Sequence, residues 1–215
     1  MPRPQNYTGS GSTPSIVNGY NSLGETMGTP TGLRAILDAI EAVASDGGAY
    51  HYYYGADRTS IELGDEDHPV VDFVDGDLVV GPVSGYGLLV VTGRLTMSGN
   101  FSWMGLVLVV GDGEVDFSGG GNGADGNVIT GSLFVARIFD HGPITNGEVD
   151  PAHDHQTSQP LLSTLGSPYF NWGGGGTNDV QFDHCWADNL MDNIPFTPPT
   201  STRPLKVLSF RLLPY

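Results

Sequence analysis

Seven acidic side chains lie within residues 62–77, a segment that holds no lysine or arginine. Carboxylate oxygens are the ligands that Ca²⁺ prefers, and this charge density predicts a calcium site formed by Asp65, Asp67, Asp75 and Asp77. The segment lacks the ligand spacing of an EF-hand loop. Asp75-Gly76-Asp77 also has the composition of a corner between two strands, so both interpretations stay open. No cofactor other than calcium is expected.

Two histidines flank Asp154 in a long irregular segment, residues 140–176. Imidazole nitrogens bind transition metals, and this spacing makes His153 and His155 candidate ligands. Any further ligand would come from elsewhere, with His141 and Asp150 as candidates. The alternative is that these are solvated histidines of a loop.

Three acids alternate at Asp112, Glu114 and Asp116, so on a strand they share one face. Paired carboxylates cleave glycosidic bonds, which suggests a polysaccharide-active enzyme. Such an enzyme also needs a basic residue nearby, and residues 95–136 contain no lysine or arginine. The plainer interpretation is solvent-facing acids between turns, so we expect no catalysis.

Aromatic residues form a second kind of candidate site. In His51-Tyr52-Tyr53-Tyr54, strand geometry puts Tyr52 and Tyr54 on one face and Tyr53 on the other. Together with Trp172 these tyrosines are predicted partner-binding residues, because exposed aromatic rings stack on sugars and anchor protein partners. A carbohydrate-binding adhesin would also use Trp103, Tyr169 and Phe170. The alternative is a strand that covers the core.

The elements that would position these residues are short apolar runs separated by turn residues. Leu88–Val91, Leu106–Val110 and Leu133–Ala136 are typical of buried strands. The spacing is regular, with 17 residues from Val71 to Leu88, 18 from Leu88 to Leu106, and 17 from Leu78 to Leu95. A chain that returns to the same face at such intervals predicts a mainly β fold, a short parallel β-helix or β-solenoid.

One amphipathic helix is predicted over residues 30–45. Thr29 can cap it, Pro30 suits its first turn, and its apolar stripe would cap or flank the β body. The predicted organisation is an extended segment over residues 1–28 followed by one domain over residues 29–215. Within that domain we expect coils over about 68–138, a loop excursion over 140–176, and returning strands over 179–187 and 205–213.

Composition limits the partners. With 24 acidic and 8 basic residues the formal charge is −16, which repels nucleic acids and anionic lipid headgroups. No segment approaches the ~20 apolar residues of a membrane span, and the first residues lack the apolar stretch of a signal peptide. The single cysteine, Cys185, is predicted to be a buried core residue.

Four runs carry a family resemblance: DGDLVV, GYGLLVVTGRLTMSGNFSWMGLVLVVGDGEVDFSGGGNG, LLSTLGSPYFNWGGGGTNDVQFDHCW and KVLSFRLLPY. Together they resemble the C-terminal region of PilX-like proteins, which are associated with type IV pili. The similarity covers most of the chain from the helix near Leu33 to Tyr215. In that family the region follows a pilin-like hydrophobic anchor, so the resemblance implies a β-rich module carried outside the inner membrane.

These observations together predict a non-catalytic structural protein that is extracellular or on the cell surface. It would be pilus-associated or filament-forming and act by self-association or by docking onto pilin-like subunits, with surface glycans as further possible partners. The alternatives are a polysaccharide-active β-helix enzyme and a carbohydrate-binding adhesin module.

Overall fold

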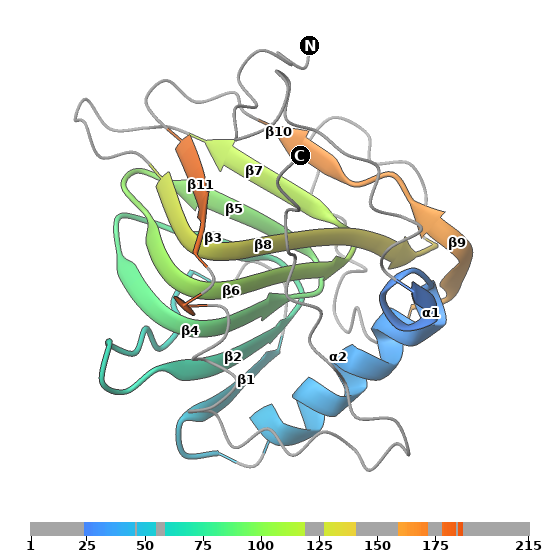
Figure 1. Cartoon of the computed structure of the whole chain (residues 1–215), viewed down its shortest axis with the longest axis horizontal. Coiled ribbons are helices and arrows are strands. Elements are labelled where there is room, and N and C mark those ends of the chain that lie inside the picture. The colour runs from blue at the N-terminus through green and yellow to red at the C-terminus, as the bar shows by residue number, and fades with distance from the viewer. Residues whose placement is uncertain are drawn as a thin grey trace, which may run out of the picture.

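The computed structural model describes residues 24–45, 47–54, 59–118, 127–140, 159–171, 178–183 and 185–186. In these ranges the protein is mainly β, and its strands form two sheets of mostly parallel strands (Figure 1). This confirms the expected β-rich class.

Along the chain from β2 to β8, successive strands belong alternately to sheet A and sheet B. Sheet A has the order β1 (Tyr50–Tyr54), β2 (Val70–Asp75), β4 (Ser84–Val91), β6 (Ser102–Gly111), β8 (Asn127–Phe139) and β11 (Asn178–Phe182), with β9 (Leu161–Gly166) antiparallel to β8. Sheet B has the order β10 (Tyr169–Asn171), β7 (Glu114–Ser118), β5 (Arg94–Ser98) and β3 (Leu78–Val80). From β2 to β8 the chain passes from one sheet to the other at every corner. We call each successive pair, β2–β3, β4–β5 and β6–β7, a tier.

The observed register matches the predicted spacing. Val71 pairs with Leu88, Leu88 pairs with Leu106, and Leu78 pairs with Leu95. Because paired residues of parallel strands point to the same face, each apolar position lies on its equivalent in the next tier. The 17- and 18-residue intervals therefore predicted the strand pairing correctly.

The main core lies between the two sheets. It contains Leu89, Val107 and Ile129 of sheet A and Leu95 and Phe117 of sheet B, all fully buried. These residues alternate along their strands with residues that face outward. Burial of such apolar side chains is the main term that stabilises the stacked tiers.

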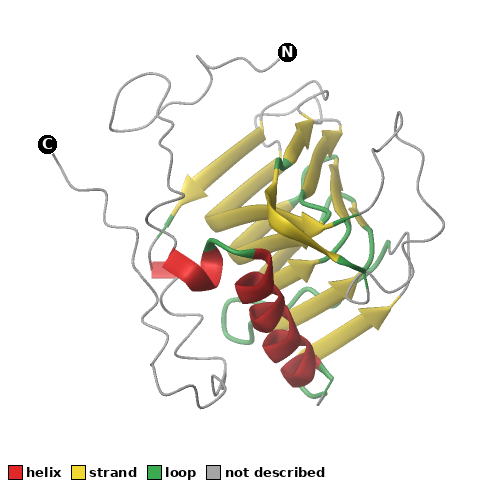
Figure 2. Ribbon diagram, turned by 90° about the vertical axis from the view of Figure 1, so that its right-hand side faces the viewer, coloured by secondary structure: helices red, strands yellow, loops and turns green. Residues whose placement is uncertain are grey.

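The helices cover the outer face of sheet A. Besides the short α1 (Gly24–Met27), α2 (Pro30–Ala44) lies against the strands, as Figure 2 shows. The Thr29 hydroxyl accepts the N–H of Gly32 at 3.1 Å and caps α2. Leu33 and Leu37 pack in one cluster with Val71, Phe73 and Val90 of the sheet. The predicted helix is thus confirmed, and it flanks the sheet.

A column of glycines crosses the long strands of sheet A. Gly87, Gly105 and Gly131 are paired in register and have φ of 134°, 138° and 137°. A Cβ atom on Gly131 would overlap the carbonyl oxygen of Gly105 in the tier beneath. Only glycine allows both this φ and this close approach.

Four sequence expectations were wrong. The segment expected to be extended ends in the helix α1, and the expected loop excursion contains β9 and β10. The strand expected over 179–187 stops at Phe182, and residues 185–186 are helical. Cys185 is exposed because the chain has already left the sheet there, so it is no core residue. The strand expected over 205–213 lies outside the described residues.

Candidate functional site

Asp75 and Asp77 form the corner between β2 and β3. The Asp75 carboxylate accepts the Thr92 hydroxyl at 3.0 Å and the Tyr52 hydroxyl at 3.2 Å. Asp77 accepts the backbone N–H of Arg94 at 2.7 Å. Both aspartates are buried, and their oxygens hold the corner of the next tier in place. The corner interpretation is confirmed.

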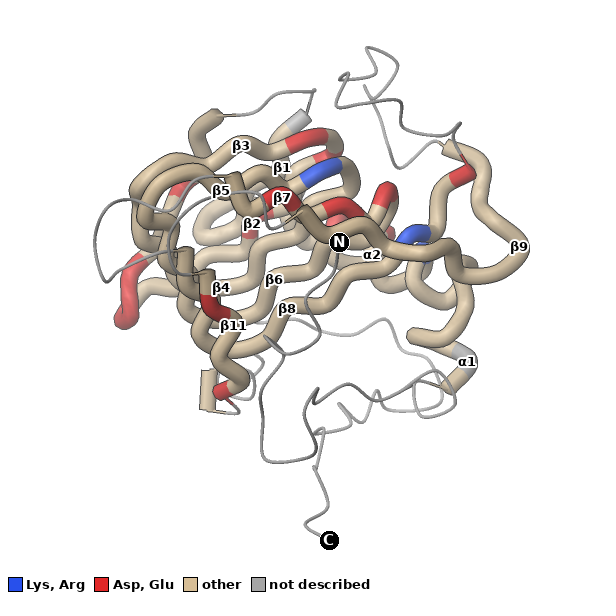
Figure 3. Tube along the Cα trace, turned by 90° about the horizontal axis from the view of Figure 1, so that it is seen from above, with Lys and Arg blue, Asp and Glu red and all other residues tan. Residues whose placement is uncertain are grey.

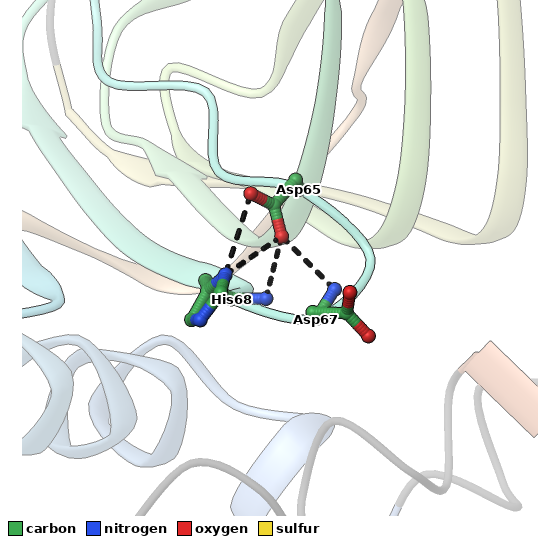
Figure 4. A network of polar contacts seen from close by, with 3 residues as sticks. All are labelled: Asp65, Asp67 and His68. Carbon is green, nitrogen blue, oxygen red and sulfur yellow. Dashed lines mark hydrogen bonds and ion pairs between the residues drawn. The ribbon is translucent and has the colours of Figure 1, made fainter.

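Asp65 and Asp67 lie in a separate exposed turn (Figure 4). Asp65 Oδ1 accepts the backbone N–H groups of Asp67 at 3.0 Å and His68 at 2.8 Å, and lies 3.0 Å from His68 Nδ1. The backbone hydrogen bond from His68 is the main cause that lowers the pKa of Asp65. Asp65 thus stabilises its own turn, as aspartates commonly do.

The described residues show no arrangement of side chains that would bind a metal ion. Among the described residues no group of three or more His, Cys, Asp or Glu side chains is placed to hold a metal ion. The structure therefore does not bring Asp65, Asp67, Asp75 and Asp77 together as one calcium site. His153 and His155 lie outside the described residues.

The tyrosines of β1 contact the protein itself. Tyr52 stacks on Phe73 with ring centroids 5.7 Å apart and packs on the side of α2. Tyr53 packs against the core between the sheets, and its hydroxyl accepts the N–H of Glu62 at 2.8 Å. The two rings take opposite faces, as expected, and cover the two cores. The side chains of Tyr54 and Trp172 lie outside the described residues, and the partner-binding role stays a prediction.

The alternating acids are less open than expected. Asp112 and Glu114 are buried, which contradicts the solvent-facing interpretation for these two. Arg94 Nε donates to Glu114 Oε2 at 2.8 Å, and in Figure 3 a basic position lies among acidic ones where β3, β5 and β7 begin. The sequence alone did not indicate Arg94 as the basic partner, because it lies in the preceding tier, one residue before the range 95–136 that was searched for basic residues. Asp116 accepts the amide of Asn171 at 3.2 Å, which ties β7 to β10.

The charges around Arg94 stabilise its cationic form. Burial alone would lower its pKa, but the hydrogen bond and charge of Glu114, with the charges of Asp77 and Asp116, raise it. Both partners of this ion pair are largely shielded from solvent, with side-chain exposures of 20% for Arg94 and 3% for Glu114. The ion pair connects β5 to β7.

A second buried pair joins β1 to β2. His51 Nδ1 lies 2.9 Å from Asp72 Oδ1, and these residues are direct cross-strand partners. Asp72 has no solvent exposure, and burial raises its pKa to about 7, although the hydrogen bond and charge of His51 act in the opposite direction. Sequence analysis missed this pair. The available signal was that Asp72 lies two residues from both Val70 and Val74, so on a strand it shares the face of these two core residues.

The two sheets end together at β10 and β11, beyond β7 and β8 (Figure 1). Phe170 pairs with the core residue Val115, and Val180 pairs with the core residue Ile129. Both therefore extend rows of apolar core residues that run from strand to strand. They are nevertheless 38% and 37% exposed. We call this end the terminal surface. It consists of Tyr169, Phe170, Val180 and Phe182, the exposed large hydrophobic residues of the described chain.

Trp103 is not part of any surface. It is fully buried in the core, and its indole N–H donates to the carbonyl oxygen of Gly87 at 3.1 Å. A sugar-stacking role for Trp103 is therefore excluded. Tyr169 and Phe170, proposed for the same role, are exposed on β10.

Comparison with known protein families, characterised proteins and solved structures finds no match to this chain. The resemblance to PilX-like proteins therefore stays a prediction. None of the helices in the described ranges has the length and apolar character needed to cross a bilayer.

Proposed function

We propose that this protein is a β-solenoid, a short parallel β-helix, with a non-catalytic structural role, and that it self-associates end to end. The support for the solenoid is the passage of the chain between two sheets. From β4 to β8, each strand is in parallel register with the strand two places earlier. Stacked architectures of this kind need their end tiers covered.

The terminal surface is the observation that carries the proposal. Phe170 and Val180 occupy inward-facing core positions of the last strands, yet no described strand lies beyond them. Partly exposed apolar core positions on strands that end a sheet, as β10 and β11 do among the described strands, favour the addition of further strands.

A second copy of the chain is the occupant we propose. The opposite ends of the same two sheets are β1 and β3, which run parallel to the strands beside them. Docking of β1 and β3 of one copy beyond β11 and β10 of another would continue both sheets in the same direction. Such a head-to-tail contact repeats without closing and builds a filament.

The proposed place of action is the cell surface or the extracellular space, in association with a pilus. This part rests on the resemblance to PilX-like proteins and on the acidic composition, with a formal charge of −16. Pilin-like subunits are then a second class of partner for the same terminal surface.

A polysaccharide-active enzyme is the runner-up, and the Arg94–Glu114 pair is the observation that favours it. It is less well supported because the Glu114 carboxylate is 3% exposed and already bound by Arg94. A carbohydrate-binding module is favoured by the exposed aromatic residues Tyr169 and Phe170.

Sedimentation velocity over a wide range of protein concentration tests the proposal. We expect the wild type to form species larger than the monomer and Phe182→Glu to remain monomeric, because the added carboxylate would be buried in the contact. Ser84→Glu is the matched control, since it adds the same charge at an exposed position of β4. A wild type that stays monomeric at the highest concentration, or two variants that behave alike, would contradict the proposal.

A further inference from the structure

We propose that His51 and Asp72 form a proton-binding site that latches the edge strand β1 onto the sheet. The proton is the ligand, and release of β1 is the conformational response. This proposal does not depend on self-association, because every group in it belongs to one chain.

The position of the pair supports a latch. Among the described strands, β1 is at the end of sheet A and pairs with β2 alone. His51 and Asp72 are directly opposite across this junction, and the Nδ1–Oδ1 contact of 2.9 Å is a side-chain bond between the two strands. The His51 side chain is 26% exposed, whereas the Asp72 side chain is fully buried, so His51 lies between Asp72 and solvent.

The free-energy cost of burying a charged Asp72 side chain makes the docking of β1 sensitive to pH. Asp72 faces the core between Val70 and Val74, and its second oxygen, Oδ2, is buried without a hydrogen-bond partner among the described groups. A buried carboxylate with an unpaired oxygen is destabilised when it carries a charge. When β1 leaves, Asp72 becomes the side chain of an exposed sheet edge, and water satisfies both oxygens.

The two charged neighbours act in opposite directions. The hydrogen bond and charge of His51, from β1, stabilise ionised Asp72, whereas the charge of Glu62, from the segment before β2, disfavours it as burial does. The ring of Tyr53 lies 6.1 Å from the ring of His51. On the other side, β4 contributes the apolar Leu89 as the partner of Asp72. With one proton the pair balances its charge, and without it a net negative charge is buried beside Glu62.

The sign of the pH dependence follows. Burial raises the pKa of Asp72 from 3.8 to about 7 in the closed state, so the closed state binds the proton more tightly than the open state does. Proton binding therefore favours the docked strand at low pH, and this contribution is lost as pH rises from about 4 to about 7.

Amide hydrogen exchange of β1 and β2 tests the latch. After division by the intrinsic exchange rate, the opening constant of β1 should rise by up to about tenfold per pH unit between about pH 5 and 7 and level off above. Asp72→Asn keeps the shape of the side chain without its charge, so its opening constant should not change with pH. Asp65→Asn is the control and should follow the wild type, since Asp65 lies in the exposed turn.

Two results would overturn the proposal: an opening constant of the wild type that is flat across this range, or a slope that survives in Asp72→Asn. If Asp72→Asn does not fold, carbon-13 NMR of the wild-type carboxyl groups decides the question. Titration of Asp72 near pH 7 supports the site, and titration below about pH 5 excludes it. Both measurements are made on dilute protein, so that self-association does not contribute to the result.

Discussion

At the corner between β2 and β3, two acidic residues stabilise the stacking of strands. Asp75 and Asp77 are buried and bind Thr92 and Arg94. Each aspartate lies 17 residues before its partner, the same interval that separates the paired apolar residues Val71 and Leu88. The spacing visible in the sequence was therefore sufficient to align these groups, although composition alone suggested a calcium site.

The pair of His51 and Asp72 could not be predicted in the same way. Its separation of 21 residues differs from the 17- and 18-residue intervals, because the chain between β1 and β2 is longer than a regular tier. No periodicity aligns these two residues, so only the folded strands reveal their contact.

At the residue scale, Gly131→Ala should strongly destabilise the protein. A Cβ atom would meet the carbonyl oxygen of Gly105, and φ of 137° is unfavourable for alanine. Strained backbone of this kind costs about 1–3 kcal/mol, which thermal or urea unfolding can measure. Gly81→Ala is the control, because Gly81 has open space around it, and its stability should be nearly unchanged. Equal effects would mean that the glycine column is not a close contact.

Among the elements, those with a strong pattern were predicted and those without one were not. The apolar stripe and the cap of α2 gave its position, and continuous apolar runs gave β4 and β6. β9 and β10 are short and partly polar. β9 has no fully buried residue and β10 is mostly exposed, so neither alternation nor a buried apolar run marks them.

At the element scale, Leu37→Ala should weaken the packing of α2 on sheet A. Leu37 is 1% exposed in the cluster under the helix, and loss of a buried leucine side chain costs about 2–5 kcal/mol. Asp38→Ala removes only an exposed pair with Arg34 and should cost less than about 1 kcal/mol. Chemical unfolding of both variants measures the difference. A mild effect of Leu37→Ala would show that α2 contributes little to stability.

For the whole molecule, charge opposes the proposed assembly while the terminal surface favours it. Copies that each carry a formal charge of −16 repel one another, and salt screens this repulsion over about 10 Å at 0.1 M. The apolar contact through Phe170 and Val180 is much less sensitive to salt. Association should therefore strengthen as ionic strength rises, the opposite of an assembly held by ion pairs.

X-ray diffraction from oriented, concentrated wild-type protein at raised ionic strength tests end-to-end stacking most directly. Strands that continue from β11 of one copy to β1 of the next would place the strand spacing of about 4.8 Å along the long axis of the assembly. We predict filaments with a reflection at this spacing on the meridian. Monomers alone, or filaments whose strand spacing runs across the axis, would contradict the account.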